Sequence, residues 1–478
     1  MNPDQATLHE SSETPGFLAP ITVGFAAVIV AWILAWILHL PAIDASATVT
    51  LPILMIALVA TNVCMLRAHP AAGRMKTGLI AGLITGLVNL LIVGSVAVKQ
   101  PESTDAMAEY ANQFRSEAAL IIPGTILLCV AAGAIGAALA RNGGAGLTSR
   151  RSWLARFGLV TVFVYLPLIA VGGAVTSTES GLAVPDAVTS YGAISVLFPF
   201  ELMSEPRIFL EHSHRLFGTL AGLATIVLMV SVFIVEPRKY CKALALLLFV
   251  GVCLQGYMGI KRVSDLSTPI AILHGVFGQI VFALSGLLAA GLSLPWTFLP
   301  PDEDRRAAAA RARKWAWMMV GCLFLQLAMG AAARHLDRMD PPSPGADHAR
   351  LAHAAFAFLV MFIIVLAGAM AMRAGKAGAG FMGIRLLGVG LHALVTFQFL
   401  LGWAALGLIM TRKEPLAVPT PERLAGAAPI RTVEALITTT HQATGAILFL
   451  LAVVTAAWLA HLARPRLAEP RLVMPGKA

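Results

Sequence analysis

The sequence predicts an all-α, polytopic membrane protein with about twelve transmembrane helices. Of its 478 residues, 58% are hydrophobic and only 13% are charged, and the mean hydropathy is +0.79. This composition is far too apolar for a soluble domain. A helix needs about 20 apolar residues to cross a hydrocarbon core of about 30 Å. Such segments lie at residues 18–40, 51–66, 76–98, 118–140, 155–175, 208–233, 241–259, 269–294, 314–333, 351–372, 383–410 and 436–461.

The basic residues predict the orientation. If the amino terminus is inside, most of the 35 Lys and Arg residues fall on internal loops and the carboxy-terminal tail, and Lys and Arg are retained on the cytoplasmic side. We therefore expect a multi-pass protein of the cell membrane with both termini cytoplasmic. The net charge of +10 then reflects topology and does not indicate nucleic-acid binding. The first 17 residues contain no Lys or Arg, so we expect no cleaved signal peptide.

The five cysteines are predicted to be packing residues. All of them fall inside or at the edge of predicted helices, at Cys64, Cys129, Cys241, Cys253 and Cys322. No Cys-x-x-Cys or Cys-x-x-Cys-His motif indicates zinc or covalently attached haem. A structural disulfide outside the membrane is therefore not expected.

Two charged stretches divide the chain into three modules. Residues 141–156 are basic and glycine-rich, which is typical of a flexible linker. Residues 300–314 form an Ala-rich, Arg-rich stretch that we interpret as a cytoplasmic helical connector. The predicted modules are a four-helix module of unknown role (1–150), a first four-helix half (151–299) and a second four-helix half (300–478).

The two halves look related. Gly172-Gly173-Ala174 ends the fifth span and Gly330-Ala331-Ala332 ends the ninth, while Gln255 in the seventh span loosely parallels Gln398 in the eleventh. Internal duplication is common in membrane bundles and places equivalent sites symmetrically. We therefore predict an eight-helix core made of two pseudo-symmetric four-helix bundles.

Four histidines are the strongest candidate ligands. His214, His274, His353 and His441 each lie within about one turn of the start of a predicted span, after a loop on the outer face. A neutral imidazole at such a position is costly unless it binds something, and facing imidazoles commonly hold haem iron in helical bundles. The duplication pairs His214 with His274, and His353 with His441, in two haem-sized sites. Three further histidines near the outer face are reserve candidates: His212, His335 and His348.

Charged residues accompany the first pair. Glu211 precedes His214 by three residues, so the two share a helical face and the carboxylate is expected to point toward the same iron-bound group, in proton transfer or orientation. The alternative is a capping carboxylate or a salt bridge to Arg215 or Arg207. Arg215 and Arg262 could pair with haem propionates, or they could be ordinary interfacial residues.

These motifs together resemble a known family. The chain is similar to haem A synthase over about residues 155–462, in the order of the family. The resemblance rests on Glu211-His212-Ser213-His214-Arg215, the loop from Gly172 to Asp186, Gln255-Gly256, and Thr440-His441-Gln442-Ala443-Thr444-Gly445.

The resemblance implies an oxidoreductase that converts a methyl group of haem O to the formyl group of haem A, by successive hydroxylations, for terminal oxidases. It implies that Glu211, His214 and His274 handle the haem O substrate, and that His353 and His441 hold a haem b cofactor. Two histidines saturate haem iron, whereas oxygen activation needs an open position, so one substrate-side ligand is expected to be displaced. The expected partners are an electron donor, with quinol as one candidate, membrane lipid, haem O synthase and the terminal oxidase under assembly, and oligomers are compatible with the sequence.

Two other classes remain open. A non-catalytic dihaem cytochrome b needs the same four histidines and leaves Glu211 incidental. A transporter or an assembly partner without redox chemistry needs buried carboxylates or broken helices in mid-membrane. The predicted spans have almost no acidic residue at their centres, which disfavours that class.

Overall fold

The computed structural model describes residues 16–141, 149–300, 302–337, 343–411, 424 and 426–465. Within these residues the regular structure is helical, and twelve helices are long and apolar enough to cross a membrane. The protein is therefore a polytopic all-α membrane protein, as the sequence predicts. The membrane helices are α1 (Leu18–Leu38), α2 (Ala47–Leu66), α3 (Arg74–Ala97), α5 (Ala118–Leu139), α6 (Arg150–Ser177), α7 (Pro206–Val235), α8 (Lys239–Asp265), α9 (Thr268–Leu292), α11 (Glu303–Leu336), α12 (Gly345–Lys376), α13 (Met382–Met410) and α14 (Thr432–Leu462). The shorter elements are α4 (Met107–Tyr110), η1 (Ser195–Leu197), η2 (Glu201–Ser204) and α10 (Leu294–Phe298).

Several helices extend beyond the spans predicted from hydropathy. The helices that carry the four candidate histidines begin earlier than expected, so each histidine lies about two turns inside its helix rather than one. At two of these helices a polar residue caps the first turn, because Glu205 accepts from the amide of Ile208 and Ser267 accepts from that of Ile270. Side-chain caps allow a helix to begin in the polar interface, before its apolar run.

The two charged stretches also differ from expectation. Of the predicted flexible linker, residues 142–148 lie outside the described residues, and Arg150 to Arg156 already form the first turns of α6. The Ala-rich, Arg-rich stretch after residue 300 is helical, but it is continuous with the ninth span and is not a separate connector. Asp302 caps this helix by accepting from the amide of Arg305, so α11 begins at the charged residues themselves.

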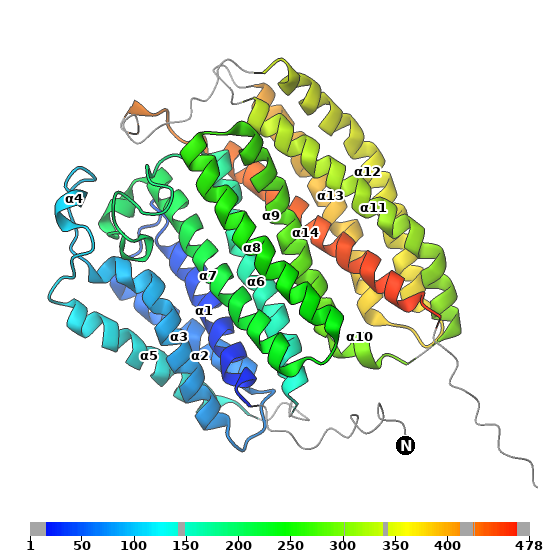
Figure 1. Cartoon of the computed structure of the whole chain (residues 1–478), viewed down its shortest axis with the longest axis horizontal. Coiled ribbons are helices and arrows are strands. Elements are labelled where there is room, and N and C mark those ends of the chain that lie inside the picture. Colours follow the sequence, from blue (N-terminus) through cyan, green and yellow to red (C-terminus); the bar gives the residue numbers. More distant parts are fainter. Residues whose placement is uncertain are drawn as a thin grey trace, which may run out of the picture.

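The amino-terminal helices α1, α2, α3 and α5 form a bundle on one flank of the molecule (Figure 1). Glycines bring α3 and α5 together at backbone distance. A Cβ atom on Gly78 would lie 2.5 Å from the carbonyl oxygen of Gly133, and one on Gly133 would collide with the carbonyl of Gly78. Close approach through small residues is the usual way that membrane helices gain packing contacts.

We therefore expect Gly133→Ala to destabilise this bundle, since an added methyl group must push two backbones apart. Overpacking of this kind costs about 1–3 kcal/mol. A thermal-shift measurement in detergent checks it. The matched control is Gly124→Ala in the same helix, where a Cβ meets nothing within 4 Å. Equal melting temperatures for the two variants would contradict the assigned packing.

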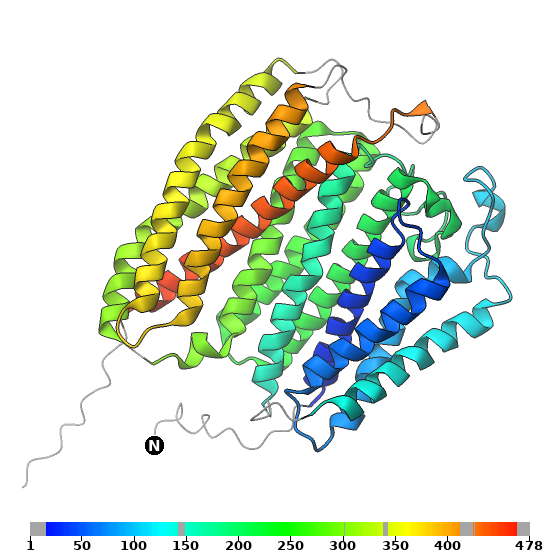
Figure 2. The same ribbon diagram turned by 180° about the vertical axis from the view of Figure 1, so that it is seen from behind.

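The remaining eight long helices form two related halves. In the first half α6, α7, α8 and α9 pack in a closed ring, and in the second α11, α12, α13 and α14 repeat the same contacts. Across the interface α14 packs on α6 as α11 packs on α9, and α9 packs on α14. This pattern is that of a two-fold pseudo-symmetric pair. Figures 1 and 2 show the first half between the amino-terminal bundle and the second half.

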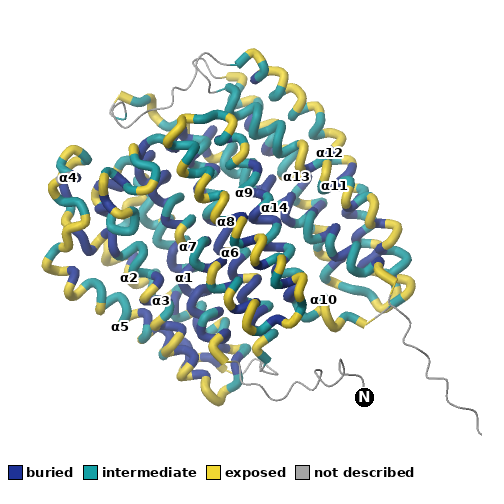
Figure 3. Tube along the Cα trace, viewed as in Figure 1, coloured by how far each residue is buried: buried dark blue, intermediate teal, exposed yellow. Residues whose placement is uncertain are grey.

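Burial follows this arrangement. In α14, two thirds of the residues in an 18-residue apolar stretch are buried, compared with 17% in the corresponding stretch of α13. Figure 3 shows exposed residues along the outer helices and buried ones toward the centre. Helix α14 therefore lies at the junction of the halves, where its residues contact both.

Candidate functional site

The second half encloses a cavity of about 300 Å³. Residues of α11, α12, α13 and α14 line most of it, and His353 and His441 are both in its wall. Apolar and aromatic side chains such as Phe399 and Trp403 line it together with a few polar groups. A cavity of this size and character is typical of a small-molecule or cofactor site.

The two histidines face each other across this space. The ring centroids of His353 and His441 are 6.3 Å apart and the ring planes are at 89°. An intervening metal ion bound at about 2 Å from a nitrogen of each ring would fill a gap of this kind. Among the described residues, no group of three or more His, Cys, Asp and Glu side chains could hold a metal. Two facing imidazoles can bind a metal whose other ligands come from a macrocycle.

Gln326 fixes the orientation of His353. Its backbone carbonyl oxygen accepts a hydrogen bond from Nδ1 of His353 at 3.0 Å, and its side-chain Nε2 donates to the carbonyl of His353 at 2.9 Å. Because Nδ1 carries the proton, Nε2 keeps the lone pair that a metal needs. The helix pair α11 and α12 therefore holds His353 in a fixed orientation, as an imidazole whose Nε2 could bind a metal.

Gln398 plays a comparable part for His441. Its Oε1 accepts from the hydroxyl of Thr444, so its amide nitrogen turns toward His441 and lies 3.5 Å from the ring Nε2. The Nδ1 atom of His441 is buried and has no hydrogen-bond partner within the described part of the chain. Nδ1 of His214 and of His274 shares this state. The rings of His441, His214 and His274 nevertheless lie near the backbone of Gln398, Leu168 and Gln255 respectively.

The first half repeats this construction around His214 and His274. A Cβ on Gly172 would lie 2.8 Å from Cε1 of His214, and one on Gly330 would lie 2.8 Å from Cε1 of His353. Each of these histidines therefore packs in a notch that only glycine leaves open.

The second histidine of each half follows the same rule. Gly259 packs against His274 and Gly402 against His441, with 3.3 and 3.0 Å from the added Cβ to Cε1. Gln255 and Gln398 lie one turn before these two glycines on their helices. The two histidine pairs thus occupy equivalent positions in the two halves.

The halves differ in what surrounds the pair. His214 and His274 lie close enough to interact electrostatically, and Arg262 lies near both. These two histidines do not line the 300 Å³ cavity, although Gly275 and Gln279, on the same helix as His274, do. The structure therefore brings the first pair together in a more charged environment.

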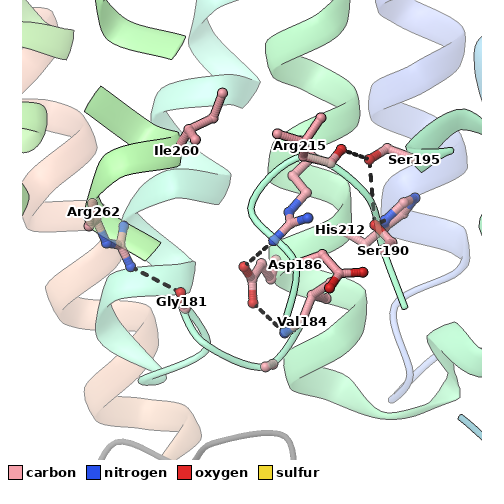
Figure 4. Close-up of polar contacts among 12 residues, drawn as sticks. Gly181, Val184, Asp186, Ser190, Ser195, His212, Arg215, Ile260 and Arg262 are labelled. Atoms are coloured by element: carbon pink, nitrogen blue, oxygen red, sulfur yellow. Dashed lines mark hydrogen bonds and ion pairs between the residues drawn. The ribbon is translucent and has the colours of Figure 1, made fainter. Parts of the chain in front are cut away.

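Glu211 is buried in the second turn of α7, where its carboxylate has two partners. Oε1 accepts from Arg215 at 2.9 Å, and Oε2 accepts from the amide of Val184 at 2.8 Å. Figure 4 shows Arg215 and Val184 close together, with Val184 on the loop that runs from Gly181 to Ser195. Of the alternatives raised from the sequence, the structure contains the salt bridge to Arg215.

Arg215 and Arg262 hold the same loop. Arg215 also donates to the carbonyl of Thr189 at 2.6 Å, and Arg262 donates to the carbonyl of Gly181 at 3.4 Å. A side chain at Gly181 would collide with the Arg262 guanidinium. Both arginines are therefore placed beside the first histidine pair, and both bind protein carbonyls.

The histidines named as reserves have other surroundings. His212 is buried, with Nδ1 3.3 Å from the hydroxyl of Ser190 and its ring on Phe198. His348 is exposed and bonds to the carbonyl of Pro344. His335 lines the cavity, as does its neighbour Arg334.

Sequence reasoning missed two groups. Gln326 was not singled out, although a lone glutamine four residues before Gly330 in an apolar span is a usable signal. Arg334 and Glu179 were also missed. They form an ion pair between the two halves, and Arg334 also donates to the carbonyl of Thr176. No local pattern predicts this pair because its members are far apart in the chain.

The comparison with protein families bears on this part of the molecule. Residues 155–340 match the family model COX15-CtaA, cytochrome oxidase assembly protein. The matched range runs from α6 through α11 and contains Glu211, His214 and His274, so it supports the resemblance noted from the motifs. His353 and His441 lie beyond it, in the half that repeats the same histidine geometry. No curated protein and no solved structure matches the chain.

Proposed function

We propose that the chain is a haem A synthase, which oxidises a methyl group of haem O to a formyl group and supplies haem A to terminal oxidases. The observation that carries this proposal is the repetition of one histidine site in two halves, one of them inside the range that matches the cytochrome oxidase assembly family. A synthase needs two such sites, one for a cofactor and one for the substrate. The family match by itself supports the broader function in cytochrome oxidase assembly.

The second half suits the resident cofactor. His353 and His441 would hold haem b, since both rings line the cavity at a separation that accepts a metal between them. Haem b held by two histidines would supply electron transfer, because both axial positions are filled. The chain contributes the rigid orientation of His353 through Gln326 and a largely apolar wall.

The first half suits the substrate. His214 and His274 would bind haem O, one of them weakly enough to leave during turnover. Each hydroxylation would insert one oxygen atom from dioxygen, take two electrons from a donor such as quinol, and release one water. The second hydroxylation gives a hydrated aldehyde that loses water. The loop held by Glu211 and Arg215 would exclude bulk water from this site, and Glu211 is the carboxylate best placed to accept or return a proton there.

The reaction is tested directly by the haem that forms. The protein should be expressed in a host that makes haem O and no haem A, followed by chromatography of the extracted haems. Haem A is expected only when the protein is present. Unchanged haem O beside a protein that has bound haem would overturn the proposed reaction.

Glu211→Gln is expected to lower haem A formation by about 100-fold or more if the carboxylate moves a proton, since such groups contribute about 10²–10⁴ in rate. The amide keeps an acceptor for the Val184 amide, so the loop retains that hydrogen bond. The measurement is the ratio of haem A to haem O in extracts with matched amounts of protein. Arg207→Lys is the control, because Arg207 lies on the same helix and bonds the Ala428 carbonyl instead.

One observation favours a second candidate, a non-catalytic dihaem cytochrome b. Glu211 is engaged by Arg215 and Val184, which is sufficient reason for a buried carboxylate without catalysis. A cytochrome would bind two haems with unchanged spectra in Glu211→Gln and would leave haem O unconverted in both proteins.

A further inference from the structure

The amino-terminal bundle has no part in the chemistry described so far, yet it packs tightly on the first half. Helix α1 packs along α6, with Phe25 against Phe157 at 5.4 Å between ring centroids. Trp32 and Trp36 meet Phe217 and Phe209 of α7. Figures 1 and 2 show this bundle beside the first half, on the side away from the second.

The segment that connects α6 to α7, residues 178–205, is here called the outer loop. On its core side it bonds the residues beside the first histidine pair. The amide of Val184 donates to Glu211, the carbonyl of Thr189 accepts from Arg215, and Ser190 contacts His212. The position of the outer loop therefore sets the surroundings of Glu211 and Arg215.

On its other side the outer loop bonds residues 94–114 of the amino-terminal bundle. The amide of Ile194 donates to Oδ1 of Asn112 at 2.9 Å, and the amide of Glu201 donates to Oε1 of Gln100 at 3.0 Å. The amide of Phe200 donates to the carbonyl of Ser95 at 3.1 Å. Three backbone amides of the loop thus donate to acceptors from another module, and two of these hydrogen bonds, to Asn112 and Gln100, lie at exposed positions.

Apolar packing accompanies these bonds. Met107 of α4 is only 1% exposed and lies in one buried cluster with Val184, Ala193 and Phe198 of the outer loop. The His39 ring meets Phe200 edge-on at 5.1 Å. Val184, whose amide binds Glu211, is therefore in the same cluster as a residue of the amino-terminal bundle.

We propose that the amino-terminal bundle is a positioning module, which fixes the outer loop and through it Glu211 and Arg215 at the substrate haem site. This inference rests on the proposed function for the identity of the substrate. That the bundle fixes the outer loop does not depend on the proposed function. Asn112 is the decisive positioning residue, because its side chain holds the middle of the loop and its φ of 63° is left-handed.

The backbone at Asn112 allows a matched pair of variants. Asn112→Gly keeps the left-handed backbone and removes the acceptor, whereas Asn112→Asp keeps both an acceptor and a residue that tolerates this conformation. Glu102→Gln, at an exposed position of the same segment, controls for a general effect of substitution there.

Hydrogen exchange of the full-length protein, read by mass spectrometry, tests the contact. In Asn112→Gly the amides of residues 184–201 are expected to exchange about fivefold faster, the effect of one lost hydrogen bond, while those of α1 and α12 are unchanged. Asn112→Asp should restore slow exchange. Equal exchange in wild type and Asn112→Gly, or no rescue by Asp, would overturn the proposal.

Haem A formation provides the second readout. It should fall in Asn112→Gly and recover in Asn112→Asp, with the bound haem b spectrum unchanged in both. Normal haem A formation in Asn112→Gly would overturn the link from loop to site. If the wild type makes no haem A, the proposed function fails, and the exchange data still decide whether the bundle holds the loop.

Discussion

Replacing His441 by Ala is expected to remove haem b from the purified protein. The ring of His441 faces His353 at 6.3 Å across the cavity, so its loss leaves any metal there with one protein ligand. Loss of groups that merely orient a ligand costs about 10–100-fold in metal affinity, and loss of the ligand itself should cost more. The measurement is the ratio of haem to protein, with the absorption spectrum of the reduced protein.

His392→Ala is the matched control for this prediction. His392 lies in α13 of the same half, and its Nδ1 donates to the carbonyl of Gly388 at 2.7 Å within its own helix. Its replacement should leave haem b in place. Full haem b content in both His441→Ala and His353→Ala would contradict the cofactor site.

His274→Ala is expected to stop haem A formation while the haem b spectrum stays. His274 belongs to the first half, where Gly259 and Gln255 contact it, and it does not line the cavity of the second half. Removing it should weaken substrate haem binding by more than about 100-fold, because even the loss of a group that only orients a metal ligand costs about 10–100-fold in affinity. The measurement combines a haem O titration of the purified variant with haem analysis of cells that express it.

The opposite outcome is equally informative. If His274→Ala loses haem b and keeps haem O binding, the two halves have exchanged roles, and the assignment of substrate and cofactor is wrong. Gly275 and Gln279 on the same helix line the cavity of the second half, so a general distortion of α9 would affect both sites. Retention of the haem b spectrum in His274→Ala separates that effect from ligand loss, because a distorted α9 would disturb the cavity of the second half as well.

The sequence predicts the helices well because their signal is local. Every predicted span became a helix, including the short second one, because about 20 apolar residues in a row have no other stable arrangement in a bilayer. The ends were less predictable. Capping by Glu205, Ser267 and Asp302 lengthened helices into polar sequence that hydropathy assigns to loops.

The part of the candidate site that is repeated in the two halves was predictable from the sequence. The equivalent positions of Gly172 and Gly330, and of His214 and His353, are visible in the sequence, and in the structure each glycine forms the notch for its histidine. Glu211 illustrates the limit. Its spacing from His214 and Arg215 fixes a helical face and makes the salt bridge to Arg215 foreseeable, but its other partner, the amide of Val184, was decided by a loop whose path depends on distant contacts.

The chain by itself determined the membrane class, the number of spans and the positions of the four histidines, because these follow from hydropathy and from repeated spacing within single helices. Only the tertiary structure decided that His353 and His441 face each other across a cavity, that Arg334 joins the halves through Glu179, and that the amino-terminal bundle holds the outer loop. Those contacts join residues from about 80 to more than 150 positions apart. Their energies depend on packing between helices, and local sequence carries no signal for that packing.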